Sequence, residues 1–426
     1  MQKAKTILKA TKTQGGMIVH IGCRDGGLVT ALGVCGNFLI HGLDADPTNV
    51  SRAREHITSL DMYGRVSIDR LRSTLPYIDN IVNLIVMENL QVPKEEIMRV
   101  LVPGGRAYLA GTVVTKPFMT GIDDWTHFMH DSTGNAVAND TVVSPPKYLK
   151  WVGGPRWAKN HGLMGSMMGL VAANGRIFSI VDEGYVGKDQ TFAAPGWMLI
   201  ARDAYNGAVL WSKPIEKWHS SFWRLKSGPA QLPERIVADA NRLYVTLDIN
   251  GPVSALDPAT GKRLYVCEES VGTEEILVNN GVLFLLRNPD REDGKHTEPV
   301  RNDKGEYSGV SPYGEYPKEI MAVNAATGKV LWQKKSVVVA MTLAADDHKV
   351  YFHNGDKIVC LDRNNGSRKW TSPPVARLKP VPANFTPTLI AYKDVVLFAG
   401  GKGEADREED MLSAYDGNSG KKLWEI

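Results

Sequence analysis

The stretch VHIGCRDGG, residues 19–27, decides the fold of the first part of the chain. An apolar run stops here at a glycine-rich turn, which is how a buried strand ends at a nucleotide-binding loop. Arg24 stands in the middle, where such loops commonly carry a further glycine. The stretch predicts a strand, a tight turn and a helix, and it leaves open whether the loop holds a cofactor.

Outward from this loop, residues 1–113 alternate strands with helices. Strands are predicted at 17–22, 38–45, 64–71, 81–90 and 106–111, and helices at 26–34, 47–60 and 94–101. The run at 81–90 is almost entirely apolar, as in a parallel strand that is covered on both faces. Strand–helix alternation with short links favours a doubly wound, Rossmann-like α/β domain.

From residue 160 the pattern changes to short β-rich runs in which Asn-Gly recurs. Asn-Gly between apolar runs predicts hairpins, because both residues tolerate positive φ. One element, in which Asp or Asn precedes a turn, a glycine and a final Trp or Tyr, occurs at 201–211, 255–265, 322–332, 360–370 and 414–424. Each copy follows another hairpin, so each repeat has four strands, which is typical of propeller blades.

We therefore predict three parts: an α/β domain at 1–113, a linker with the first propeller strand at 114–159, and an all-β propeller at 160–426. The first propeller strand is expected near 146–152, and the polar insert at 288–318 is expected to be a long surface loop. About five blades are present. The propeller family that these repeats resemble usually closes with seven or eight blades, so we expect an incomplete ring and a fragment of a longer chain.

Four segments, VHIGCRDG, GLDADP, LPYIDNIVNLIV and EEIMRVLVPGGRAYL, resemble in order and spacing the class I S-adenosylmethionine-dependent methyltransferases. The five-copy element resembles the quinoprotein alcohol dehydrogenase-like propellers, the repeat family of PQQ enzymes and of the outer-membrane β-barrel assembly lipoprotein. The combination resembles methyltransferase-plus-propeller proteins of environmental bacteria.

The first resemblance implies an S-adenosylmethionine site formed by Gly22, Cys23, Asp25, Gly26, Asp44, Ala45, Asp69 and Met87. The two glycines match those that let backbone amides approach the methionine part of the cofactor. Asp44 matches the acid that accepts hydrogen bonds from both ribose hydroxyls. The alternative for Asp44 is a cap of the helix at 47–60, a role that Asp46 fits better.

The remaining site residues carry weaker matches. Asp69 corresponds loosely to the acid that meets the adenine amino group, and a surface role is equally compatible with its position. Met87 ends the fourth strand and is expected to face the methyl group. Asn83 stands where the family often has Asp, and no Asn-Pro-Pro-Tyr motif is found, so no catalytic residue is assigned. Further strands are not evident after Gly111, so an acceptor pocket would need the propeller as a wall.

The linker segment DDWTHFMHD, residues 123–131, contains the residue types of a metal site in His127, His130 and Asp131. It lacks the glutamate of an HExxH motif and any obvious further ligand. We therefore predict no metal and expect an aromatic and histidine plug that docks the linker on a propeller face. A second aromatic group, WHSSFW at 218–223 with His161 and Trp197, either lines a central funnel that stacks a planar ligand or sugar, or packs between blades.

Composition narrows the function classes. A net charge of +3 with no basic stripe predicts no nucleic-acid partner, and no apolar run approaches the length of a transmembrane helix. The four cysteines include no adjacent pair and no convincing calcium set is found, so PQQ is not expected as a cofactor. Without a signal peptide the chain is expected in the cytoplasm, or in the periplasm if its true N-terminus is missing.

The leading interpretation is an S-adenosylmethionine-binding, methyltransferase-like protein whose propeller binds a small molecule, a glycan or a protein. The alternatives are a non-enzymatic propeller scaffold with a degenerate methyltransferase domain, and a quinoprotein oxidoreductase.

Overall fold

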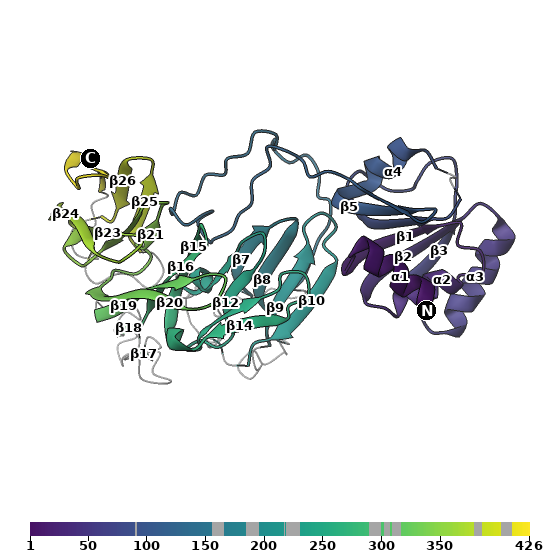
Figure 1. The fold of residues 1–426 in the computed structure, drawn as a ribbon, viewed down its shortest axis with the longest axis horizontal. Helices are drawn as coiled ribbons and strands as arrows, with labels where there is room; N and C mark the ends of the chain where they lie inside the picture. Colours follow the sequence, from purple (N-terminus) through teal and green to yellow (C-terminus); the bar gives the residue numbers. More distant parts are fainter. Residues whose placement is uncertain are drawn as a thin grey trace.

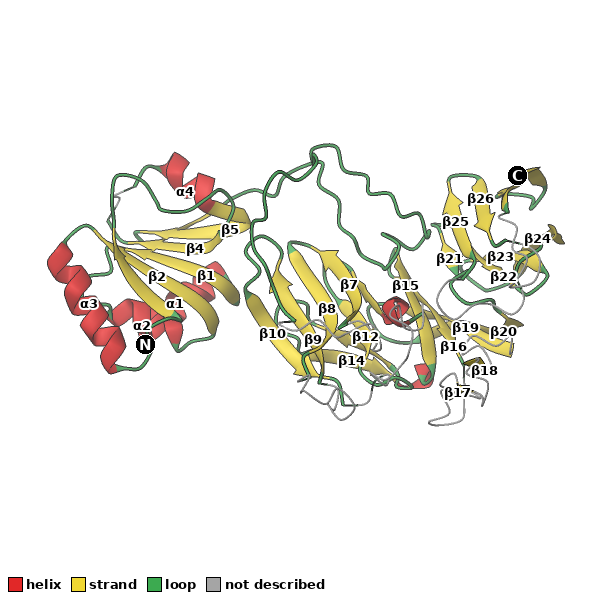
Figure 2. Cartoon of the chain, turned by 180° about the vertical axis from the view of Figure 1, so that it is seen from behind, coloured by secondary structure: helices red, strands yellow, loops and turns green. Residues whose placement is uncertain are grey.

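The structure, a computed structural model, describes residues 1–89, 92–155, 166–184, 196–216, 218, 231–288, 300–301, 307–308, 317–378, 386–401 and 411–426. An α/β domain with one six-stranded sheet is followed by five four-stranded antiparallel sheets (Figure 1). Viewed from behind, the segment that links the two parts runs along one side of the antiparallel sheets (Figure 2). The predicted fold class, an α/β domain followed by about five propeller blades, is confirmed.

The α/β domain contains α1 (Gln2–Thr11), β1 (Gly15–Ile21), α2 (Gly27–Gly33), β2 (Asn37–Asp44), α3 (Pro47–Ser59), β3 (Val66–Arg70), β4 (Val82–Met87), α4 (Lys94–Val100), β5 (Leu101–Leu109) and β6 (Thr112–Thr115). The sheet order is β3-β2-β1-β4-β5-β6, and the first five strands are parallel. One apolar core lies between the sheet and α1, α2 and α3, and another lies on the face covered by α4. The apolar run of β4 is therefore explained by burial on both faces.

A sixth strand, which the sequence did not reveal, follows β5 as an antiparallel partner. Ala110 and Gly111 join the two strands with φ values of 46° and 93°. Positive φ at both central residues is the geometry of a two-residue hairpin turn. The expectation that the sheet ends at Gly111 was therefore wrong, because a non-glycine residue takes one of the two left-handed positions.

The first two blades contain β7 (Met167–Ala173), β8 (Arg176–Asp182), β9 (Trp197–Asp203) and β10 (Val209–Pro214), then β11 (Ile236–Ala238), β12 (Leu243–Thr246), β13 (Val253–Leu256) and β14 (Arg263–Cys267). The third contains β15 (Thr273–Asn279), β16 (Val282–Arg287), β19 (Pro317–Asn324) and β20 (Val330–Val337). The last two contain β21 (Ala344–Ala345), β22 (Lys349–His353), β23 (Lys357–Asp362) and β24 (Arg368–Pro374), then β25 (Thr388–Tyr392), β26 (Val395–Ala399), β27 (Leu412–Asp416) and β28 (Lys422–Glu425).

Short elements accompany the blades: the 3₁₀ helices Leu232–Arg235 and Glu268–Ser270, and the paired strands β17 (Val300–Arg301) and β18 (Tyr307–Ser308). That pair belongs to the polar insert predicted at 288–318. Most of the insert lies outside the described residues, so its expected surface position stays a prediction.

In the first four blades, the repeated Trp or Tyr packs against the turn of the next blade. The side chains of four of them donate to a backbone oxygen there: Trp211 to Pro258, Tyr265 to Ala325, Trp332 to Arg363 and Trp370 to Gly417. Their rings lie over turn glycines that have positive φ, namely Gly261, Gly328, Gly366 and Gly420. A methyl group at these glycines would collide with the ring, so aromatic and glycine are required together.

Trp151 makes the same contact from the linker. Its Nε1 donates to the Ala204 oxygen at 3.0 Å and its ring lies over Gly207. The strand expected at 146–152 is not formed. The residues around Trp151 are held by side-chain contacts, such as Lys150 Nζ to the Asn80 oxygen, in place of a strand partner.

Candidate functional site

The predicted cofactor loop lies at the carboxyl end of β1. The backbone N–H groups of Gly22 and Cys23 both donate to the Leu43 oxygen of β2, at 2.7 and 3.3 Å. The Arg24 N–H donates to Asp44 Oδ2 at 2.8 Å. Successive amides of the loop are thus directed at the end of β2, which draws the loop and the Asp44 carboxylate together.

Gly26 is required by close packing. Its φ is 81°, and a Cβ at this position would lie 3.2 Å from the Cβ of Ala53 in α3. Arg24 adopts a φ of 49° and is exposed, so its side chain does not fill the interior of the loop. Asp25 is also exposed, and its Oδ1 accepts from the Gly27 N–H at 3.0 Å. The loop is therefore compatible with a ligand on its outer side.

Asp44 is only 6% exposed. Its Oδ1 accepts hydrogen bonds from the Asp46 N–H and from Asn49 Nδ2, and its Oδ2 accepts from Arg24. Because a carboxylate offers about four acceptor positions, one position on Oδ2 is left. The capping role falls to Asp46, whose Oδ1 accepts from the Thr48 N–H at the first turn of α3.

His20 lies beside this carboxylate and was missed by the sequence reasoning. It is 3% exposed, and neither ring nitrogen has a hydrogen-bond partner in the described part of the chain. Burial lowers its pKa to about 4, so the ring is neutral at pH 7. Lys3 of α1 forms an ion pair with Glu88, just after β4, and both charges influence His20. The sequence did contain a signal for His20, because it is a polar residue inside the apolar run of β1.

The other predicted site residues are more scattered. Asp69 pairs with His41 Nε2 at 3.1 Å and with Arg54 Nη2 at 2.6 Å, so its carboxylate is held by β2 and α3. Ala45 is exposed next to Asp44. Met87 is fully buried in the core on the α4 side. The structure brings Gly22, Cys23, Asp25, Gly26 and Asp44 together, whereas Asp69 and Met87 have their own packing partners.

In the described part of the chain, the propeller contacts another edge of the α/β domain. The first blade contacts the amino ends of the parallel strands, where Asn37 Nδ2 donates to the Val209 oxygen at 2.6 Å and Gly15 packs against Leu210. The cofactor loop is at the opposite, carboxyl ends. Because β10 docks on the other edge of the domain, the described residues give no support for the propeller as a wall of an acceptor pocket, and that expectation stays a prediction.

The second candidate region is the central segment, residues 123–135, which the sequence singled out for its histidines. First strands of successive blades contact one another, so they form the inner edge of the arc. Five inner-edge N–H groups donate to this segment at 2.7–3.0 Å: Ala172 to Trp125 O, Ala238 to Thr126 O, Val278 to His127 Nε2, Ala345 to Ser132 O and Ala391 to Thr133 O. These donors occupy equivalent positions in the five repeats. The central segment therefore forms a hydrogen bond with the inner strand of every blade.

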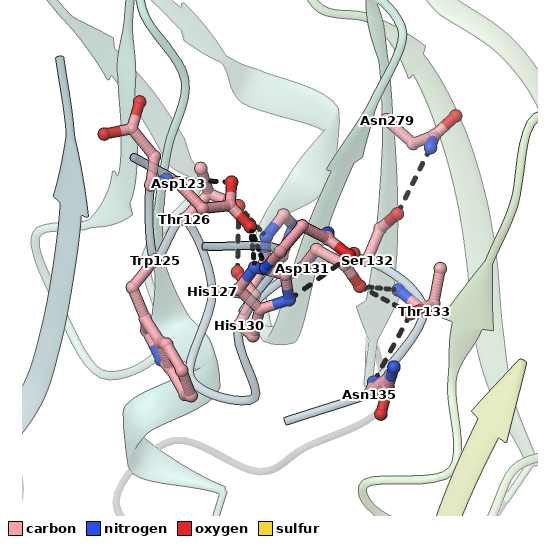
Figure 3. A network of polar contacts seen from close by, with 12 residues as sticks. Asp123, Trp125, Thr126, His127, His130, Asp131, Ser132, Thr133, Asn135 and Asn279 are labelled. Atoms are coloured by element: carbon pink, nitrogen blue, oxygen red, sulfur yellow. Dashed lines mark hydrogen bonds and ion pairs between the residues drawn. The ribbon is translucent and has the colours of Figure 1, made fainter. Parts of the chain in front are cut away.

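The histidines of the central segment have structural partners (Figure 3). His130 Nε2 contacts Asp123 Oδ2 at 2.8 Å, and His127 Nδ1 contacts Thr126 Oγ1 at 2.7 Å. Burial lowers the pKa of His127 to about 3, which keeps it neutral and able to accept from Val278. Among the described residues, no group of three or more His, Cys, Asp or Glu side chains is arranged to hold a metal ion.

A small cavity of about 30 Å³ adjoins the central segment. Glu234 and Glu275 face it together with His127 and Asp131. Burial, reinforced by Glu275, raises the pKa of Glu234 to about 8. Glu275 Oε1 accepts from Gln231 and from the Met341 N–H, so the two carboxylates have unequal surroundings.

Of the second aromatic group, Trp197 and Trp218 are buried in the core between the first two blades. This favours packing for these two residues. His161, His219 and Trp223 lie outside the described residues. In the part of the chain that is described, no helix has the length and hydropathy needed to cross a bilayer.

Comparison with known proteins agrees with this division. The family model for outer membrane protein assembly factor BamB matches residues 308–426. The structure of BamB from Moraxella catarrhalis is 15% identical, covers 59% of this chain and 67% of its own, and has a TM-score of 0.34. The chain is thus similar to solved methyltransferases over about a quarter of its length, and residues 308–426 are similar to the BamB family model. No curated protein matches the sequence.

Two solved methyltransferases illustrate the first likeness. The S-adenosylmethionine-dependent methyltransferase from Aquifex aeolicus is 23% identical over 24% of this chain and 61% of its own, with a TM-score of 0.23. The geranyl diphosphate C-methyltransferase from Streptomyces coelicolor is 16% identical over 25% and 43%, with a TM-score of 0.24. The chain spans about half the length of the solved methyltransferases that it matches.

Proposed function

We propose that this chain is an S-adenosylmethionine-binding, methyltransferase-like protein whose propeller binds a small molecule, a glycan or a protein. The observation that carries the proposal is the buried Asp44 carboxylate, held at 2.8 Å from the backbone of the glycine loop. A buried carboxylate at the end of the second strand, beside a glycine turn, suits a ligand with vicinal hydroxyl groups.

The residues present fit the ribose and the loop-bound part of such a ligand. Oδ2 of Asp44 has one acceptor position for a ribose hydroxyl. A second hydroxyl would compete with Asn49, whose contact with Oδ1 is the longest of the three at 3.2 Å. His20 is buried beside Asp44 and is not counted among the groups that would touch the ligand.

When bound, S-adenosylmethionine supplies an electrophilic methyl group. The chain contributes orientation: the loop at 22–26 and Asp44 would fix the ligand, and the Lys3–Glu88 pair would hold α1 at the rim. Positioning of two reactants gives much of the acceleration in reactions of this type. No residue is assigned as a general base, and the acceptor would approach from the carboxyl ends, away from the propeller.

A second candidate is a non-enzymatic scaffold in which the α/β domain is degenerate. One observation favours it specifically. The propeller contacts the edge opposite the cofactor loop, so the two halves share no described site at the loop. In that case the α/β domain acts as a structural support, and the propeller alone carries binding.

Calorimetric titration of the full chain with S-adenosylmethionine separates the two. Binding that is lost in Asp44→Asn and retained in Asp46→Asn supports the proposal, because only the first carboxylate faces the loop. Arg24→Gly is expected to bind as well as the parent, since the Arg24 side chain is exposed. Absence of heat with the intact protein at about 1 mM ligand defeats the proposal and leaves the scaffold.

A further inference from the structure

A cavity of about 130 Å³ opens between the α/β domain and the first two blades. This volume is roughly ten times the ~10–15 Å³ needed to hold one water molecule. The walls come from the end of α1, the starts of β1, β4 and β5, and turns of the blades. The cavity is thus at the amino end of β1, separated from the cofactor loop by the strand length of roughly 20 Å.

Three cations line this cavity. Lys12 and Arg106 come from the α/β domain, and Arg176 comes from the first blade. None of the three forms an ion pair with a carboxylate among the described residues. Burial lowers the pKa of Arg176, opposed by Asp203 and Asp257, which marks a partly desolvated guanidinium. Lys12 is exposed, and Arg106 and Arg176 are half-buried, so the three cations share a partly sheltered wall where an anion is favoured.

Two carboxylates of the blades, Asp203 and Asp257, offset part of the positive charge at Arg176. Asp203 is the one acid among the described lining residues, so the lining carries 3 − 1 = +2. The Asp203 carboxylate is already occupied by Asn83 Nδ2 and by the backbone N–H groups of Tyr205 and Asn206. The lining residues therefore keep an excess of positive charge, which favours an anion in the cavity.

We propose that this interdomain cavity binds a compact, doubly charged oxyanion: inorganic phosphate or the phosphate group of a small metabolite. Arginine presents a planar fork of donors that matches such oxygens, and lysine adds a point charge. Because Arg106 and Arg176 belong to different domains, the bound anion bridges the α/β domain and the first blade. The site is independent of S-adenosylmethionine binding, which concerns the opposite strand ends.

Calorimetry on the full chain tests the proposal, with inorganic phosphate and glycerol phosphate as the two probes in chloride buffers of matched ionic strength. Arg106→Gln and Arg176→Gln are each expected to weaken binding roughly tenfold or more, because each removes a charge-assisted contact. Arg52→Gln is the matched control, since Arg52 is an exposed arginine of α3 far from the lining residues. If Arg176→Gln does not fold, Lys12→Gln replaces it as the second test variant, because Lys12 is exposed, and it is also expected to weaken phosphate binding.

Tighter binding of inorganic phosphate identifies a free anion, and tighter binding of glycerol phosphate identifies a metabolite. Either result supports the site when Arg106→Gln weakens it and Asp44→Asn does not. The proposal is overturned if neither probe gives heat at about 10 mM, or if Arg52→Gln weakens binding as much as Arg106→Gln. Circular dichroism and the melting temperature without phosphate verify that the variants are folded.

Discussion

Asn83, at the start of β4, donates from Nδ2 to Oδ2 of Asp203 in the first blade, with a distance of 2.6 Å. The amide oxygen of Asn83 accepts from the Met17 N–H and from Asn206 Nδ2. One side chain thus joins β1, β4 and the turn between β9 and β10. The contact couples the two halves of the chain at the edge opposite the cofactor loop.

We predict that Asn83→Ala weakens this coupling. The buried Asp203 carboxylate would lose a donor, and burial already raises its pKa. The expected cost is about 1–3 kcal/mol, and the α/β domain is expected to melt separately from the blades. Scanning calorimetry checks this by the number of transitions. Asn89→Ala, at an exposed position after β4, is the control and keeps the parent profile.

The contacts of Asn83 between the two halves of the chain could not be predicted from the sequence. The alternation of apolar runs and the Asp–turn–Gly–Trp element predicted both halves of the fold, because burial and turn geometry are local properties. The contacts of Asn83 with Asp203 and Asn206 join residues 120 and 123 positions apart. Nothing local in the sequence indicates such a pairing, so Asn83 was considered only as a departure from a methyltransferase motif.

The sequence predicted that the central segment docks on the propeller, but it did not predict contacts with all five blades. Its histidines and tryptophan indicated docking on the propeller. However, four of the five inner-edge contacts use backbone oxygens, which any residue supplies. His127 is the exception, since its ring accepts from Val278. Gly22 and Asp44 lie close together because strand order brings the ends of β1 and β2 together, and their role in cofactor binding stays a prediction. The buried His20 was missed, since the nearby charges of Lys3 and Glu88 depend on the placement of α1.

The contact between Trp332 and Gly366 gives a prediction for blade packing. A Cβ at Gly366 would lie 2.6 Å from the Trp332 ring, and the φ of Gly366 is 69°. Gly366→Ala is therefore expected to destabilise the propeller by about 2–4 kcal/mol, from overpacking and left-handed strain together. Urea unfolding measures the loss. Gly281→Ala is the matched control: its φ is 77° with open space around the Cβ, so about 1–2 kcal/mol of strain is expected alone. Equal losses in the two variants would contradict the packing argument.

From the lowered pKa of His127 we predict that the free energy of unfolding falls at acidic pH. Its folded-state pKa is about 3, below the ordinary value of 6.5. The unfolded chain therefore takes up a proton that the folded chain refuses. This stability is complete above pH 6.5 and is lost as the pH falls toward 3. In His127→Phe, the buried Val278 N–H loses its acceptor, which costs about 1–3 kcal/mol at pH 7.

The difference in unfolding free energy between pH 7 and pH 4 should shrink in His127→Phe, because the titrating group is gone. His348→Phe changes an exposed histidine and is expected to keep the parent's pH dependence. An unchanged pH dependence in His127→Phe would show that His127 is not held neutral by burial. Urea titrations at the two pH values provide both numbers.

From the raised pKa of Glu234 we predict that the free energy of unfolding falls at alkaline pH. Its folded-state pKa is about 8, above the ordinary 4.5, because it is buried and faces Glu275. The folded chain therefore keeps a proton that the unfolded chain releases. This stability is complete below pH 4.5 and is lost as the pH rises through 8, by on the order of a few kcal/mol.

Glu234→Gln mimics the protonated form and should abolish the loss between pH 6 and pH 9. Glu216→Gln, at an exposed carboxylate, should leave the loss intact. Unfolding curves at the two pH values decide the matter, since a loss that persists in Glu234→Gln would assign the alkaline sensitivity to another group.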